Sequence, residues 1–183
     1  NHISSLDPML IVIAILAYHP RIFVRPLTKS ELFQLPIVRS ILRNYRCIAI
    51  KRNGMDIRGM RTLSKILKVE NVLIFPEGRR SIDGTLLAGK RALGRLLQWA
   101  KPTIIPAAIW GTHQALPKGK FIPRIRKRFG VRFGPPLDMQ ALYDLPITRE
   151  SSQKIVDHIM KAIDSIKDEL ESEGNAVRIK GYT

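Results

Sequence analysis

The chain opens with Asn1-His2-Ile3-Ser4-Ser5-Leu6-Asp7-Pro8, directly before a long apolar run. Histidine is well matched to proton transfer near neutral pH, and a carboxylate commonly fixes its tautomer and orientation. Within one helix, a five-residue step would turn His2 about 140° away from Asp7, so a loop suits the pair better. Proline favours the first helical position, which predicts Asp7 as the N-cap of the next helix. The stretch is therefore either an ordinary helix start or a His–Asp catalytic pair.

The composition indicates one α/β domain with a strongly basic surface. The chain has 183 residues, of which 45% are hydrophobic, enough for a proper core. Its 31 Lys and Arg against 15 Asp and Glu give a net charge of +16. This charge favours polyanionic partners, which include phosphorylated substrates, anionic lipid surfaces and nucleic acid. The single cysteine, Cys47, excludes an internal disulfide and fits a reducing compartment.

The first residue and the longest apolar run bear on whether the chain is part of a longer protein and whether it crosses a membrane. It begins with Asn rather than Met, so we expect an N-terminally truncated piece of a longer protein. The longest apolar run, Met9 to Tyr18, is too short for a bilayer, which needs about 20 residues. We expect it to form a buried helix or one that dips into the membrane interface.

Strand and helix patterns alternate along the whole chain. Apolar runs predict strands at residues 21–25, 47–50, 72–75, 103–110 and 131–133, the first closed by Pro26. Helical periodicity predicts helices at 9–18, 29–33, 37–45, 55–69 and 90–100, and an amphipathic helix at about 150–170. Pro106 inside its strand suggests a bulge or a local break. The alternation predicts one domain over residues 1–183, with a largely parallel sheet flanked by helices.

A second group of functional side chains follows a predicted buried strand. The heptad Phe75-Pro76-Glu77-Gly78-Arg79-Arg80-Ser81 lies where open α/β sheets place their ligand sites. Arginine can bind a phosphate through two hydrogen bonds, and glycine lets the backbone approach closely. The alternative is a solvated turn whose charges pair among themselves. Arg52, after the strand at 47–50, could reach the same site or be a surface cation.

Other kinds of site find little support. His19, His113 and His158 have no companions at metal-ligand spacing, so no metal is expected. There is no Gly-x-Ser-x-Gly motif and no phosphate-binding loop that ends in Gly-Lys-Ser/Thr. The basic run at 118–132 lacks a recognition helix or an aromatic stacking sheet, which disfavours nucleic acid. A patch that faces a membrane or an anionic donor is favoured, with a solvated basic surface as the alternative.

Four ordered blocks carry a resemblance to a known family. They are Asn1-His2 with Asp7, Arg52 after an apolar strand, Phe75-Pro76-Glu77-Gly78 with Arg80-Ser81, and Ile105-Pro106. In this order they resemble the motifs of the glycerolipid acyltransferases, in particular the 1-acyl-glycerol-3-phosphate acyltransferase type. The likeness covers residues 1 to about 111. Arg79 replaces the family's usual threonine, and Gly89-Lys90-Arg91-Ala92 replaces a frequent Phe-Lys-x-Gly, which bears on the choice of acceptor.

The resemblance implies a glycerol-3-phosphate acyltransferase-like fold and acyl transfer without a cofactor or metal. The donor would be a thioester, acyl-CoA or acyl-carrier protein, and the acceptor a lysophospholipid hydroxyl. His2 would act as the general base, and Asp7 would orient it and stabilise the imidazolium. Pro106 would shape the wall of the site. The glycerol phosphate end of the acceptor would be bound by Arg52, Glu77, Gly78 and Arg80.

The sequence also bears on where the protein acts, and two other functions remain open. The charge predicts peripheral association with an anionic membrane, which we expect on the cytoplasmic face. One alternative is an acyltransferase for glycerol-3-phosphate or another lysolipid. The other is a non-catalytic basic module on membrane or nucleic acid, which explains the charge but not the ordered blocks.

Overall fold

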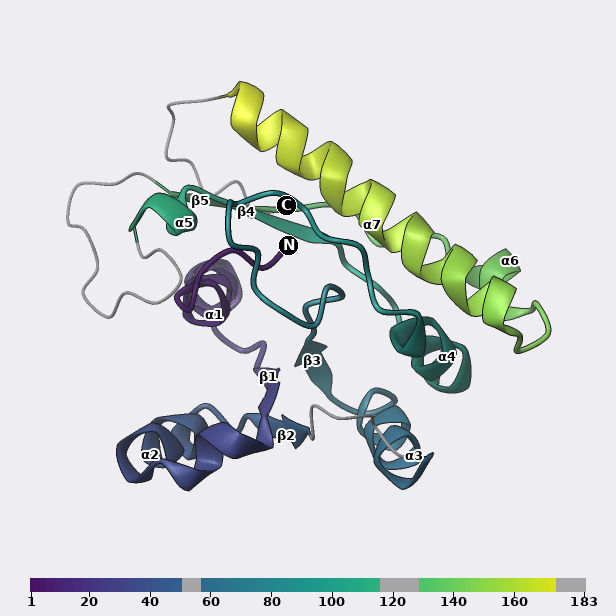
Figure 1. Cartoon of the computed structure of the whole chain (residues 1–183), viewed down its shortest axis with the longest axis horizontal. Coiled ribbons are helices and arrows are strands. Elements are labelled where there is room, and N and C mark those ends of the chain that lie inside the picture. Colours follow the sequence, from purple (N-terminus) through teal and green to yellow (C-terminus); the bar gives the residue numbers. More distant parts are fainter. Residues whose placement is uncertain (51–56, 116–128, 174–183) are drawn as a thin grey trace.

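The computed structural model describes residues 1–50, 57–115 and 129–173 (Figure 1). Its helices are α1 (Asp7–Tyr18), the 3-10 helix η1 (Ser30–Gln34), α2 (Pro36–Asn44), α3 (Ile57–Ile66), α4 (Arg91–Ala100), α5 (Thr112–Ala115), α6 (Gln140–Tyr143) and α7 (Arg149–Ser172). Its strands are β1 (Val24–Lys29), β2 (Ile48–Ile50), β3 (Asn71–Leu73), β4 (Ala107–Trp110) and β5 (Gly130–Phe133). Arg52 and most of the basic run at 118–132 lie outside the described residues.

The described strands form a parallel sheet and an antiparallel pair. In the parallel sheet, β1 lies between β2 and β3, with Leu27 opposite Ile48 and Val24 opposite Asn71. In the antiparallel pair, Ala107 of β4 lies opposite Phe133 of β5. The α/β class with a largely parallel sheet and flanking helices is confirmed.

Two prolines, Pro26 and Pro106, were expected to interrupt strands. The prediction that Pro26 closes its strand is wrong, because β1 continues to Lys29. Pro26 lies where β1 changes partner, since β3 pairs with β1 up to Pro26 and β2 pairs from Leu27 onward. The missing N–H therefore falls at the junction of two ladders. The break expected at Pro106 is confirmed, as β4 begins at the next residue.

The start of α1 also differs from the prediction. Asp7 is not the N-cap, because Leu6 occupies that position and Asp7 is the first helical residue. No side chain caps this helix end. The carboxylate of Asp7 instead turns back toward the preceding loop, where it accepts the N–H groups of Ile3 and Ser4.

The long helix α7 covers α4 and the β4–β5 pair (Figure 1). Its predicted apolar stripe is buried, namely Ile155, Ile159, Ile163, Ile166 and Leu170. A capping box between Thr148 and Ser151 fixes its start. Gly94 of α4 lets the two helices approach closely, because a Cβ there would lie 1.9 Å from the carbonyl oxygen of Ser152.

Helix α1 is buried on one side only. Ile11, Val12 and Ala14 are buried, whereas Met9, Ile13 and Leu16 are exposed. No helix within the described residues has both the length and the apolar character to cross a membrane.

Candidate active site

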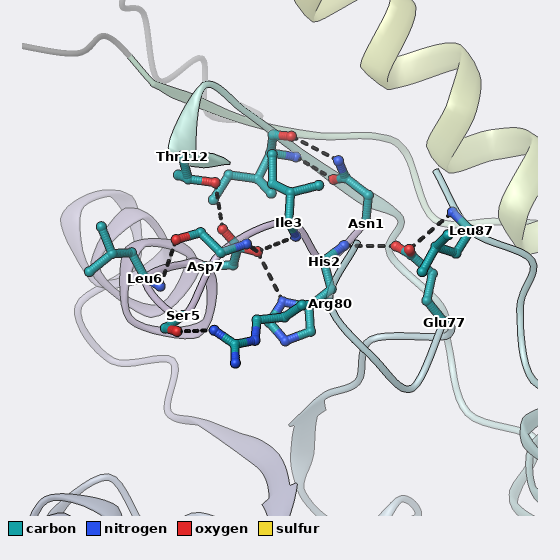
Figure 2. A network of polar contacts seen from close by, with 12 residues as sticks. Asn1, His2, Ile3, Ser5, Leu6, Asp7, Glu77, Arg80, Leu87 and Thr112 are labelled. Carbon is teal, nitrogen blue, oxygen red and sulfur yellow. Dashed lines mark hydrogen bonds and ion pairs between the residues drawn. The ribbon is translucent and has the colours of Figure 1, made fainter. Parts of the chain in front are cut away.

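Asp7 lies at the centre of the candidate site and is fully buried. Its Oδ2 lies 2.9 Å from Nδ1 of His2 and accepts the N–H groups of Ile3 and Ser4, each at 2.7 Å. Its Oδ1 accepts the hydroxyl of Thr112 at 2.6 Å (Figure 2). An ionised carboxylate only accepts hydrogen bonds, so a neutral His2 ring carries its proton on Nδ1. Nε2 is then left able to accept a proton.

The His2 ring is held in a loop, as predicted from the spacing of the pair. It stacks on Phe75, with ring centroids 4.1 Å apart and an angle of 24° between the planes. The backbone carbonyl of His2 accepts the N–H of Ser81 at 2.8 Å. The side chain is 18% exposed, so the ring remains open to a substrate.

Asn1 attaches the loop to β4. Its side-chain amide donates to the carbonyl of Ile109 at 2.9 Å and accepts the Ile109 N–H at 2.8 Å. This paired contact, between residues far apart in sequence, fixes the chain directly before His2.

Glu77 is buried beneath the loop, with only 1% of its surface exposed. One carboxylate oxygen accepts the backbone N–H of His2 at 2.7 Å, and the other accepts that of Leu87 at 3.0 Å (Figure 2). Burial raises the pKa of Glu77, while the hydrogen bonds from Leu87 and His2 act in the opposite direction. This geometry argues against direct contact between Glu77 and an acceptor. It indicates that Glu77 holds the backbone of His2.

Gly78 and Arg80 lie on the exposed side of the same loop. Gly78 has a φ of +64°, which glycine adopts easily, and the stem of Lys90 lies against it. A guanidinium nitrogen of Arg80 donates to the hydroxyl of Ser5, which brings this arginine to the His2–Asp7 loop (Figure 2). Of the predicted residues, the structure thus gathers His2, Asp7, Glu77, Gly78 and Arg80 into one site.

A cavity of about 160 Å³ adjoins the two arginines. Its lining consists of Arg79, Arg80, Ile82, Asp83, Thr85 and Leu87. Hydrogen bonds from Thr85 and Ser81 hold the pKa of Asp83 well below its usual range. The cavity thus combines two arginines, the Asp83 carboxylate and apolar side chains, and Arg80 links it to Ser5 of the His2–Asp7 loop.

Three residues of the site were not given a role from the sequence. Asn1 and Phe75 were quoted only as parts of their motifs, and Thr112 was not singled out. Thr112 follows the carboxyl end of β4, the kind of position where α/β folds place functional groups. Pro106 lies beside Gly134, near Ile166 of α7, and its role in the wall of the site stays a prediction. No group of three or more His, Cys, Asp or Glu suited to a metal occurs within the ranges that the structure describes.

The arrangement can perform proton transfer beside an anion-binding surface. An oriented imidazole with a free Nε2 can take a proton from a hydroxyl. Arginines on the adjoining loop can hold a phosphate group of the molecule that carries this hydroxyl.

The chain matches known proteins in sequence and fold. The family model described as Acyltransferase matches residues 1–110. Two curated relatives, from Limnanthes douglasii and Limnanthes alba, are each named 1-acyl-sn-glycerol-3-phosphate acyltransferase and are 28% identical over 143 residues. These matches cover 75% of this chain but 48% of each relative, so the chain spans about half the length of the curated relatives it matches.

A solved structure shares the fold over nearly the whole chain. It is the 1-acyl-sn-glycerophosphate (LPA) acyltransferase PlsC from Thermotoga maritima, with a TM-score of 0.69 and 24% identity. The match covers 97% of this chain and 66% of the PlsC chain. The family model covers the His2–Asp7 loop, the arginine-bearing loop and β4 together, and the chain belongs to the acyltransferase family.

Proposed function

We propose that the chain is the catalytic part of an enzyme that acylates the free hydroxyl of 1-acyl-sn-glycerol-3-phosphate. The product would be phosphatidic acid, an intermediate of phospholipid biosynthesis. The observation that carries this proposal is the contact between His2 and the buried Asp7, with Arg80 held beside their loop through Ser5. The names of the curated relatives support the choice of acceptor.

The proposed reaction is a direct transfer with no acyl-enzyme intermediate. Nε2 of His2 takes the proton of the acceptor hydroxyl as its oxygen attacks the thioester carbonyl. The new C–O bond forms, the C–S bond breaks, and the imidazolium returns the proton to the departing thiolate of CoA or acyl-carrier protein. Asp7 stabilises the imidazolium, as in serine hydrolases, but the acceptor itself supplies the nucleophile. A positioned base of this kind contributes about 10²–10⁴-fold.

The arginines would hold the acceptor in place. In this proposal Arg80, the exposed backbone of Gly78 and Arg52 bind the phosphate of the acceptor. Binding through the phosphate makes the attack effectively intramolecular, which can contribute as much as the base. Glu77 would contribute indirectly through the His2 backbone, because its carboxylate is enclosed.

The test is acyl transfer by the purified protein with a matrix of donors and acceptors. Donors are acyl-CoA and acyl-carrier protein, and acceptors are lysophosphatidic acid, glycerol-3-phosphate and neutral lysolipids. His2→Ala should lose at least about 100-fold in kcat while keeping its unfolding transition. His158→Ala is the matched control, since His158 is exposed on α7. Full activity in a folded His2→Ala protein would refute the mechanism, and transfer to another acceptor would correct the substrate.

We also propose that the protein binds the surface of an anionic membrane. The segment from α1 to α2 exposes Met9, Ile13, Leu16, Tyr18, Ile22, Phe23, Leu32, Leu35, Ile37 and Ile41. Six cations lie between residues 21 and 46, and Glu31 is the sole carboxylate there. Each cation near an anionic leaflet contributes about 1 kcal/mol, so apolar contact and charge would act together.

Vesicle binding tests this surface. The protein should sediment with phosphatidylserine-containing vesicles and less with neutral ones. Ile37→Glu should weaken binding, whereas Val69→Glu should not, although the two side chains are 80% and 81% exposed. Equal binding by both variants would exclude this face, and binding without acyl transfer by the wild type would favour the non-catalytic module.

A further inference from the structure

Thr112 touches the catalytic pair from the far side of Asp7. Its hydroxyl donates to Oδ1 of Asp7 at 2.6 Å, and neither residue has measurable exposure. This distance falls in the range of charge-assisted O–H···O⁻ hydrogen bonds. The two residues are 105 positions apart in the sequence, so only the folded chain brings them together.

The turn after β4 aims Thr112 at this oxygen. Strand β4 ends at Trp110, and Gly111 has a φ of +80°, a conformation that favours glycine. Helix α5 then begins at Thr112, and the carbonyl of Gly111 accepts the N–H of Gln114 at 3.1 Å. Thr112 is β-branched and therefore has few χ1 rotamers, which limits the directions that its hydroxyl can take.

The other described donors to Asp7 leave its carboxylate plane free to rotate about Oδ2. Nδ1 of His2 and the backbone N–H groups of Ile3 and Ser4 all meet Oδ2, so these three contacts hold the carboxylate at a single point. The terminal torsion of an aspartate is broad, and its plane can pivot about such a point. A donor on Oδ1 supplies the second point and fixes the plane.

We propose that Thr112 is a positioning residue for the His2–Asp7 pair. By donating to Oδ1, it keeps Oδ2 directed at Nδ1 of His2, and so sets the direction in which Nε2 faces the acceptor. This inference rests on the proposed function, because it concerns His2, the proposed general base of the acyl transfer. Thr112 itself touches Asp7 and not the substrate.

The test compares variants with and without the hydroxyl. Thr112→Val keeps the volume and removes the donor, Thr112→Ala is a second donor-free variant, and Thr112→Ser restores the donor. The donor-free variants should lose about 10- to 100-fold in kcat, the equivalent of one hydrogen bond to a charged group. KM for the acceptor should stay constant, and Thr112→Ser should recover most of kcat. Thr62→Val, on the exposed surface of α3, is the matched control.

A second readout does not depend on turnover. The proton on Nδ1 of His2 gives an NMR signal that reports its hydrogen bond to Asp7. This signal should shift or broaden in both donor-free variants and return in Thr112→Ser. An unchanged signal and unchanged kcat in Thr112→Val would overturn the proposal, as would an equal loss in a folded Thr112→Ser. Should the wild type transfer no acyl group, the proposed function fails, and the NMR comparison still decides the role of Thr112.

Discussion

Replacing Glu77 by glutamine tests whether this residue holds His2 or binds the acceptor. The change keeps the shape of the side chain and removes its charge. The two carboxylate oxygens accept N–H groups at 2.7 Å from His2 and 3.0 Å from Leu87. Glutamine retains one oxygen, so in either orientation its NH₂ group faces a backbone N–H. With 1% of the residue exposed, water cannot serve the group that is left unpaired.

The magnitude follows from two opposing contributions. A buried hydrogen-bond donor without an acceptor costs about 1–3 kcal/mol. In the glutamine variant, one backbone N–H and the NH₂ group that faces it both lack an acceptor. Burial raises the pKa of Glu77, so its ionised form costs stability above its ordinary pKa, and this cost falls as the pH drops. Glutamine removes that cost and offsets part of the loss. We expect a net loss of about 1–3 kcal/mol, or about 2–12 °C in Tm for a chain of this size.

Urea unfolding and steady-state acyl transfer measure the two consequences. Below the unfolding transition, Glu77→Gln should lower kcat about tenfold and leave the acceptor KM nearly constant, because His2 shifts and the acceptor contacts do not. The control is Glu70→Gln on the surface, where the ion pair with Arg25 at 2.8 Å should contribute less than about 1 kcal/mol. Wild-type stability and kcat with a raised acceptor KM would refute this reasoning and restore a direct role in binding.

Three further substitutions test the supporting structure. Gly94→Ala should lower Tm in a thermal melt, because its Cβ would lie 1.9 Å from the carbonyl oxygen of Ser152 and this clash outweighs the helix propensity of alanine; an unchanged Tm would contradict the packing. In the Asp83→Asn variant, the free energy of unfolding should fall less steeply toward acid pH than in the wild type, measured by urea unfolding from pH 7 to about pH 2. Hydrogen bonds from Thr85 lower the pKa of Asp83, so its contribution is full above the ordinary pKa of about 3.9 and disappears as the pH falls; an equal acid slope in wild type and variant would exclude it. Gly78→Ala should cost about 1–2 kcal/mol in urea unfolding, because φ is +64° there, and no loss would show that the turn relaxes freely.

The sequence predicted those parts of the site that depend on local chemistry. The His–Asp spacing before Pro8 indicated a loop, and the structure places His2 and Asp7 in contact across it. The stripe along α7 predicted its buried side because helical periodicity reports directly which face is apolar.

The remaining features depend on contacts between distant segments. Asp7 was predicted to cap α1, but its carboxylate turns toward donors in the loop and toward Thr112. Glu77 was predicted to face a substrate, but it accepts an N–H 75 residues away. A carboxylate in a sequence carries no sign of which side of the chain it will face. Only the tertiary packing decides that direction.

The burial of two carboxylates in one site separates the catalytic hypothesis from the basic-module hypothesis. Asp7 and Glu77 have 0% and 1% of their surface exposed, and burying an ionised group is costly unless its oxygens are hydrogen-bonded. Among the described contacts, four donors serve Asp7 and two serve Glu77, and three of these six come from His2 or its immediate neighbour Ile3. A module that needed only a positive surface would gain nothing from two buried negative charges that fix one histidine. An enzyme whose base must meet a hydroxyl in a fixed direction gains from both, and the same burial therefore supports a catalytic role for His2.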